Sequence, residues 1–143
     1  MKKEDIQLYR EIQKNARMGQ HAINTVSPKV YDDSMALMLT RDSMRYNQIG
    51  ERAKEELLKV KVTPEADNKL ENLMLSAAIH ANTLLNTSSE HIAGMLIQGS
   101  NMGINRMWKT LGQNTGASLQ AVELAKELMD FEESNIKELK KYL

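Results

Sequence analysis

Two carboxylates fall among apolar residues of predicted helices, where an ionised group is unfavourable. Asp42 lies within the apolar arc of a helix predicted for about residues 28 to 60, and Glu132 lies in the middle of the apolar arc of another, about 117 to 142. Burying an ionised carboxylate requires a partner or a raised pKa. Two carboxyl groups in unlike environments can also divide acid and base roles, although no substrate-shaped feature accompanies this pair.

Counting residues from the helix ends places both carboxylates at nearly the same height in a helical bundle. The same counting brings side chains from the first predicted helix to that height, and a tyrosine lies one turn from Asp42. We call the predicted cluster the polar waist. Its members are Tyr9, Gln13, Asp42, Tyr46 and Glu132.

The polar waist has two interpretations at the sequence level. It is either an interior hydrogen-bonded cluster that fixes helix register, joined by Arg41 or Arg45, or a site for a metal ion or small ligand. Bundles that hold two iron or manganese ions use Glu-x-x-His pairs on two helices, and no such pair occurs in this chain. No metal-ligand set is therefore assigned, and iron or manganese stays an alternative only.

The other reactive residue types point to structural roles. Ser88 and His91 are three residues apart, but no third group is evident that would orient them as a catalytic dyad. The ten methionines at helical spacing are typical of core filling, and the absence of cysteine excludes thiolate chemistry. No catalytic residue is assigned, and an enzyme is not the expected class.

Length and composition limit the partners. The 143 residues predict one domain spanning 1–143. Lys plus Arg equals Asp plus Glu at 19 each and only one Phe and one Trp occur, so binding of nucleic acid is not expected. The sequence begins with polar residues and has no apolar run of the roughly 18 residues that would span a membrane. The expected location is cytoplasmic, without membrane association.

Apolar residues recur at helical spacing between three breaks in the pattern. Ser27-Pro28 and Thr63-Pro64 predict helix starts, and the glycines of residues 112–116 predict a connection, which gives helices at about 4–26, 28–60, 64–111 and 117–142. The third segment would be about 70 Å long, against roughly 35 to 50 Å for the others. The sequence predicts an all-α, antiparallel up-and-down four-helix bundle whose third helix is kinked or broken near 86–89, giving five helical segments.

The nature of that break stays open at this level. Thr87 and Glu90 match a capping box, which favours a new helix start, yet one apolar face runs through the region from Leu70 and Met74 to Gly103. One kinked helix is therefore an alternative to two helices.

Small and large residues on this third segment predict two kinds of contact. Gly99 and Gly103 lie at the centre of the apolar face, where we expect close packing of helices, with a ligand pocket as the alternative. On the opposite side Ile97, Ile104 and Trp108 form a second apolar facet, which predicts contact with a further helix or a second subunit.

The stretches NTLLNTSSEHIAGMLIQGSNMGI (82–104) and ELMDFEESNIKELKKYL (127–143) resemble a group of functionally uncharacterised Firmicutes proteins with ferritin-like helical bundles. The resemblance implies an antiparallel bundle, a fold that in the wider superfamily often carries a di-iron site. We expect a non-enzymatic structural or protein-interaction module that forms a homo-oligomer. The alternative is a metal- or small-ligand-binding bundle that uses Asp42 and Glu132.

Overall fold

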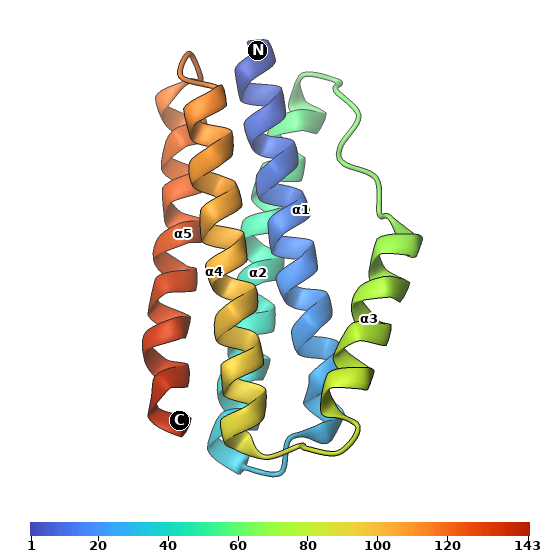
Figure 1. Ribbon diagram of the computed structural model, residues 1–143. Coiled ribbons are helices and arrows are strands. Elements are labelled where there is room, and N and C mark those ends of the chain that lie inside the picture. The colour runs from blue at the N-terminus through green and yellow to red at the C-terminus, as the bar shows by residue number, and fades with distance from the viewer.

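The computed structural model describes all residues 1–143 and contains five α-helices and no strand (Figure 1). Two short 3-10 helices, η1 (Ser27–Lys29) and η2 (Lys140–Tyr142), follow α1 and α5. The α-helices are α1 (Lys3–Val26), α2 (Asp33–Lys59), α3 (Lys69–Thr83), α4 (Ser89–Gln113) and α5 (Leu119–Leu139). The expected five helical segments are thus confirmed.

The helices form a bundle with one peripheral member. In Figure 1, α1, α2, α4 and α5 lie side by side, and α3 stands apart from them on the α1 side. The four long helices supply almost all of the buried apolar core, including Ile12, Leu39, Met107 and Leu128, whereas Ile79 is the one apolar residue of α3 that is buried. The four long helices thus form the core, and α3 packs against its outside.

Side-chain caps, and not the prolines, determine where α2 and α3 begin. Pro28 lies in η1, and α2 starts only at Asp33 because the Asp32 carboxylate accepts a hydrogen bond from the Met35 N–H at 2.8 Å. Likewise α3 starts after Asn68, which caps it, and not at Pro64. A proline fixes only its own φ, whereas a cap satisfies an otherwise free N–H of the first turn, so both predicted starts were five residues early.

The third predicted segment is two separate helices. The chain leaves helical conformation after Thr83 and resumes at Ser89, which settles the alternative of one kinked helix. Ser88 caps α4, because its hydroxyl oxygen accepts the His91 N–H at 3.2 Å; the predicted cap at Thr87 was one residue early. The His91 ring also lies 2.8 Å from the Asn82 carbonyl oxygen and links the start of α4 to the end of α3.

The break changes which residues of α3 face the bundle. Leu70 and Met74 are 65 % and 64 % exposed, although the continuous apolar face predicted them to be inside. Leu75 and Ile79 face the bundle instead, since α3 is rotated relative to α4 once the helix is interrupted. None of the five helices is long and apolar enough to cross a membrane.

Candidate ligand-binding site

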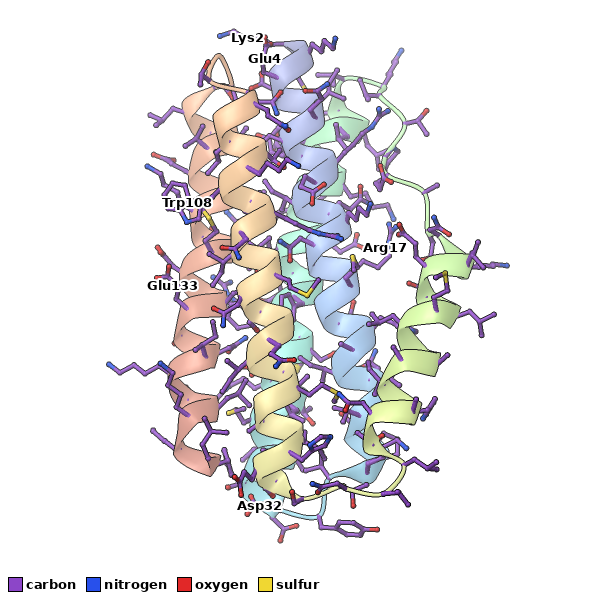
Figure 2. The ribbon with its side chains drawn as sticks, viewed as in Figure 1. Lys2, Glu4, Arg17, Asp32, Trp108 and Glu133 are labelled. Atoms are coloured by element: carbon purple, nitrogen blue, oxygen red, sulfur yellow. The ribbon has the colours of Figure 1, made fainter.

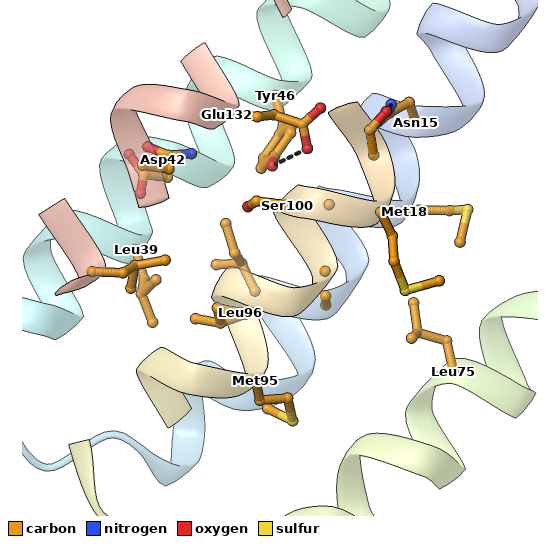
Figure 3. A pocket seen from close by; sticks show the side chains of 18 of the residues that line it. Asn15, Met18, Leu39, Asp42, Tyr46, Leu75, Met95, Leu96, Ser100 and Glu132 are labelled. Carbon is orange, nitrogen blue, oxygen red and sulfur yellow. Dashed lines mark hydrogen bonds between the residues drawn. The ribbon is translucent and has the colours of Figure 1, made fainter. Parts of the chain in front are cut away.

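A cavity of about 170 Å³ lies between α1, α3 and α4 and reaches inward to α2 and α5 (Figure 3). Exposed residues of α4, Met102 and Arg106, are among those that line it, so it opens to solvent beside that helix. Most of its wall is apolar. The larger apolar side chains of the wall include Met18, Ile23, Leu75, Ile79, Met95 and Leu96.

Two glycines of α4 shape this cavity in different ways. A Cβ on Gly99 would meet no atom within 4 Å, so the predicted close packing at Gly99 is wrong, and this residue instead leaves open space in the cavity wall. The reason is that α3, which would have covered it, stands away from α4. Gly103 is buried, and a Cβ there would lie 2.6 Å from Glu132 Oε2, so close approach at Gly103 is confirmed.

The inner end of the cavity is formed by Glu132 of α5 and Tyr46 of α2. The Tyr46 hydroxyl donates to Glu132 Oε2 at 3.0 Å, as the dashed line in Figure 3 shows. Glu132 is only 2 % exposed, and its other oxygen, Oε1, accepts no hydrogen bond. Burial raises the pKa of Glu132 to about 8, although the Tyr46 hydrogen bond opposes that rise. This carboxyl group is therefore mostly protonated at neutral pH.

Close contacts hold these two side chains in place. A Cβ on Gly19 of α1 would lie 2.5 Å from the Tyr46 ring, so the ring packs directly on the α1 backbone. The edge of Tyr46 also meets Phe131, with ring centroids 4.8 Å apart. The side-chain amide of Asn15 donates to the Gly103 carbonyl oxygen at 2.9 Å, which joins α1 to α4 at the same level. Helices α1, α2, α4 and α5 thus all fix the geometry of the site.

Asp42 forms a second buried acidic position in the cavity lining. With its amide nitrogen oriented toward Asp42, Asn135 of α5 lies 3.2 Å from both carboxylate oxygens and donates to them. Burial raises the pKa of Asp42 to about 6, and the nearby charge of Arg41 opposes this. The side chain of Arg41 nevertheless pairs outward with Glu138. The hydrogen-bond partner of Asp42 is therefore an uncharged amide.

The structure separates the members of the polar waist. Tyr46 contacts Glu132, but Gln13 accepts a hydrogen bond from the Glu65 N–H at 2.9 Å in the linker that precedes α3. Tyr9 lies near two other acidic residues, Glu56 and Asp5. Burial, with smaller contributions from their charges, raises the pKa of Tyr9 to about 12. Neither Gln13 nor Tyr9 lines the cavity. Arg45, expected as a possible member, instead pairs with Glu127 at 2.6 Å.

Sequence reasoning missed three polar residues of the cavity. These are Asn15, Ser100 and Asn135, all buried. A signal for two of them was present, because Asn15 follows Ile12 by three residues and Asn135 follows Glu132 by three, which places each on the inward face of its helix.

The predicted second facet of α4 is mostly covered within the chain. Ile104 is 8 % exposed and Ile97 is half-buried, whereas Trp108 is 56 % exposed and projects outward in Figure 2. Burial within the chain therefore explains the apolar character of Ile97 and Ile104, but not that of Trp108. A subunit interface at this facet stays a prediction.

No group of three or more His, Cys, Asp or Glu side chains converges to hold a metal ion. The three histidines lie outside the cavity lining, and His21 joins α1 to α3 through Ser76 Oγ at 2.7 Å. Comparison of the chain with protein-family models, curated proteins and solved structures gave no match.

Proposed function

We propose that this chain is a small-molecule-binding helical bundle that holds its ligand in the cavity between α1, α3 and α4. The observation that carries the proposal is the buried, unpartnered Oε1 of Glu132 at the inner end of an apolar cavity. In this proposal α1, α2, α4 and α5 form an antiparallel four-helix bundle of the ferritin-like type, and α3 covers one side of the binding site.

The composition of the cavity supports a ligand with an apolar body and one polar group. Ligand sites are concave and mostly apolar, with a few polar groups that fix orientation. Here methionine and aliphatic side chains surround the cavity, Glu132 and Tyr46 lie at its inner end, and Arg106 lies at its mouth (Figure 3). A cavity of about 150 Å³ in another protein takes up benzene. The 170 Å³ available here therefore suits a compact body of about that size.

The experiment uses benzyl alcohol as a probe and measures its binding by titration calorimetry and by amide chemical-shift changes. We expect binding that is lost in Gly99→Leu, because the new side chain would enter the cavity from a position with free space. The matched control is Gly94→Leu, on the same helix, where a Cβ also meets no atom within 4 Å but which does not line the cavity. Equal binding of benzyl alcohol to both variants would contradict the proposal, and so would a parent chain that binds neither benzyl alcohol nor its charged analogues benzylammonium and benzoate.

A second candidate function, self-association as an interaction module, is favoured by the outer side of α3. Leu70, Leu73 and Met74 are each more than 60 % exposed on this helix. The occupant we infer is a second copy of the chain, since a formal net charge of zero places no overall repulsion between copies.

Sedimentation equilibrium tests this second candidate. We expect a concentration-dependent dimer that Leu73→Glu converts to monomer. Leu37→Glu is the control, because Leu37 is equally exposed, at 72 %, but belongs to α2. A parent chain that stays monomeric at the highest accessible concentration would contradict self-association without touching the ligand proposal.

A further inference from the structure

The interior of this protein contains acidic groups and no basic ones. Three charged residues are buried, namely Asp5, Asp42 and Glu132, and no Lys, Arg or His is among the buried residues. Asp5 lies at the start of α1, where it accepts the Ser118 N–H at 2.6 Å. The other two line the cavity. A buried carboxylate is ordinarily paired with a cation, but Glu132 is bonded to the Tyr46 hydroxyl and Asp42 to the Asn135 amide, and neither forms an ion pair.

Acceptor oxygens also converge at the inner end of the cavity. The position that a Cβ would take on Gly103 is 2.6 Å from Glu132 Oε2, 2.9 Å from Glu132 Oε1 and 2.8 Å from Asn15 Oδ1. The amide nitrogen of Asn15 is already engaged with the Gly103 carbonyl, so its oxygen is the atom that faces the glutamate. These three oxygens thus pack against Gly103, and the one side-chain donor hydrogen-bonded to any of them is the Tyr46 hydroxyl, which donates to Oε2.

We propose that the ligand is a primary organic ammonium ion with a compact apolar body, whose N–H groups donate to Glu132 and whose body lies among the methionine and aliphatic side chains of the cavity. This inference rests on the proposed function and specifies its ligand class. An ammonium group carries three N–H donors and no acceptor, which matches an acceptor-rich and donor-poor pocket. A neutral alcohol offers one donor and, above the pKa of Glu132, leaves the charge of the carboxylate unmatched.

A bare metal ion fits the same oxygens less well. At the inner end one carboxylate and one amide oxygen are near each other, whereas Ca²⁺ takes about six to eight oxygen ligands and Mg²⁺ demands near-octahedral geometry. Asp42, the second acid, is engaged with Asn135. The apolar wall would contribute nothing to a metal ion, but it adds burial of apolar surface for an organic cation.

Binding should release a proton, because the glutamate is protonated in the free protein near neutral pH. The ionisable groups that line the cavity are Asp42 and Tyr46 of α2, Arg106 of α4 and Glu132 of α5; α1 and α3 place none there. Arg106 is exposed at the mouth, where its guanidinium donates to Met18 Sδ at 3.5 Å. On binding, the carboxyl O–H proton of Glu132 passes to solvent and the ammonium N–H groups take its place.

The pKa of about 8 for Glu132 sets the size of this linkage. At pH 7 about 0.9 proton should be released per ligand bound. The affinity should fall about tenfold for each pH unit below 7 and level off above pH 8. Calorimetry of the unmodified chain in two buffers of different ionisation enthalpy measures the proton release directly, and it needs no variant to fold.

Three probes of one shape test the charge requirement: benzylammonium, benzyl alcohol and benzoate. At about pH 8.5 we expect benzylammonium to bind at least tenfold more tightly than benzyl alcohol, the range of one charge-assisted hydrogen bond. Glu132→Gln should weaken benzylammonium at least tenfold and benzyl alcohol by less than about threefold. Glu133→Gln, the exposed neighbour of the same helix, is the control and should change neither.

The outcomes separate this inference from the function on which it rests. If both probes bind equally and Glu132→Gln changes neither, or if benzylammonium binding releases no proton, the ammonium inference is overturned while ligand binding stands. Tightest binding of benzoate would overturn it in favour of an anion held by Arg106 at the mouth. Binding of none of the three probes would overturn both proposals.

Discussion

Replacing Glu132 with Gln should make the protein more stable at neutral and alkaline pH and should flatten the pH dependence of its stability. The carboxyl group is 2 % exposed, and its pKa is raised from 4.5 to about 8 in the folded protein. Between these two values the folded state binds a proton that the unfolded state has lost. The free energy of unfolding therefore falls as pH rises through this window, and it is unaffected by Glu132 below the window.

The magnitude follows from the difference of about 3.5 between the folded and unfolded pKa values. At about 1.4 kcal/mol per pKa unit, the full loss above pH 8 is about 5 kcal/mol. At pH 7 about 3 kcal/mol of this has already been lost. Gln is a neutral isostere of the protonated acid and still offers Tyr46 an acceptor oxygen. The free energy of unfolding of the variant should therefore not fall with pH on account of residue 132.

Urea unfolding of both proteins at intervals from about pH 4 to pH 9 measures the effect, as the difference between their free energies of unfolding. As the pH rises, that difference should grow to about 5 kcal/mol in favour of the variant. Asp42 shifts in the same direction over a lower pH range, but it is present in both proteins and cancels. Glu133→Gln changes an exposed carboxylate that points away from the bundle in Figure 2, and its curve should parallel the parent. A constant difference between parent and Glu132→Gln across this range would refute the reasoning.

Five further substitutions test the geometry of the site and of α4. Gly103→Ala should lower the free energy of unfolding by about 1 to 3 kcal/mol because its Cβ would clash with buried oxygens, whereas Gly99→Ala, with free space, should raise it by up to about 1 kcal/mol in the same urea assay. Tyr46→Phe removes the only donor to the buried glutamate and should raise its pKa further, so the pH-dependent loss of stability should extend to higher pH and become larger in the same series of unfolding curves. Ser88→Ala should cost about 1 kcal/mol by thermal unfolding, and Thr87→Ala less than about 0.5 kcal/mol, because Ser88 is the cap of α4.

The sequence was sufficient to predict the helices and the burial of both acids. Periodic apolar residues, breakers and the excessive length of the third segment predicted an all-helical chain with a break near 86–89, and the structure has that break between α3 and α4. Asp42 and Glu132 are buried, as their positions in apolar arcs predicted. These features depend on the spacing of residues along one helix, which the sequence gives directly.

The contacts of the site depended on information that a single helix does not contain. A helical wheel places Gly99 and Gly103 on the same face but does not give the distance to the opposing surface. Glu132 fills the space next to Gly103, whereas the space next to Gly99 is open. The pairing of Asp42 with Asn135 follows from the relative rotation of α2 and α5. Tyr9 and Gln13 lie outside the site for the same reason. Their height along the bundle follows from the sequence, but the residues that they contact depend on how the helices pack.

The buried polar groups argue that the unpartnered oxygen of Glu132 is a feature of the site and not a general looseness of the core. Gln13 accepts a backbone N–H, the Asn15 amide donates to a carbonyl and the Asp42 carboxylate is bonded to an amide, so other polar groups of the interior have partners. Glu132 Oε1 is the one buried side-chain oxygen or nitrogen without a partner, and Glu132 lines the cavity between α1, α3 and α4. A buried carboxyl oxygen without a hydrogen-bond partner is destabilising. Occupancy by a cationic ligand would return that stability, because a ligand that binds only the folded state raises its free energy of unfolding.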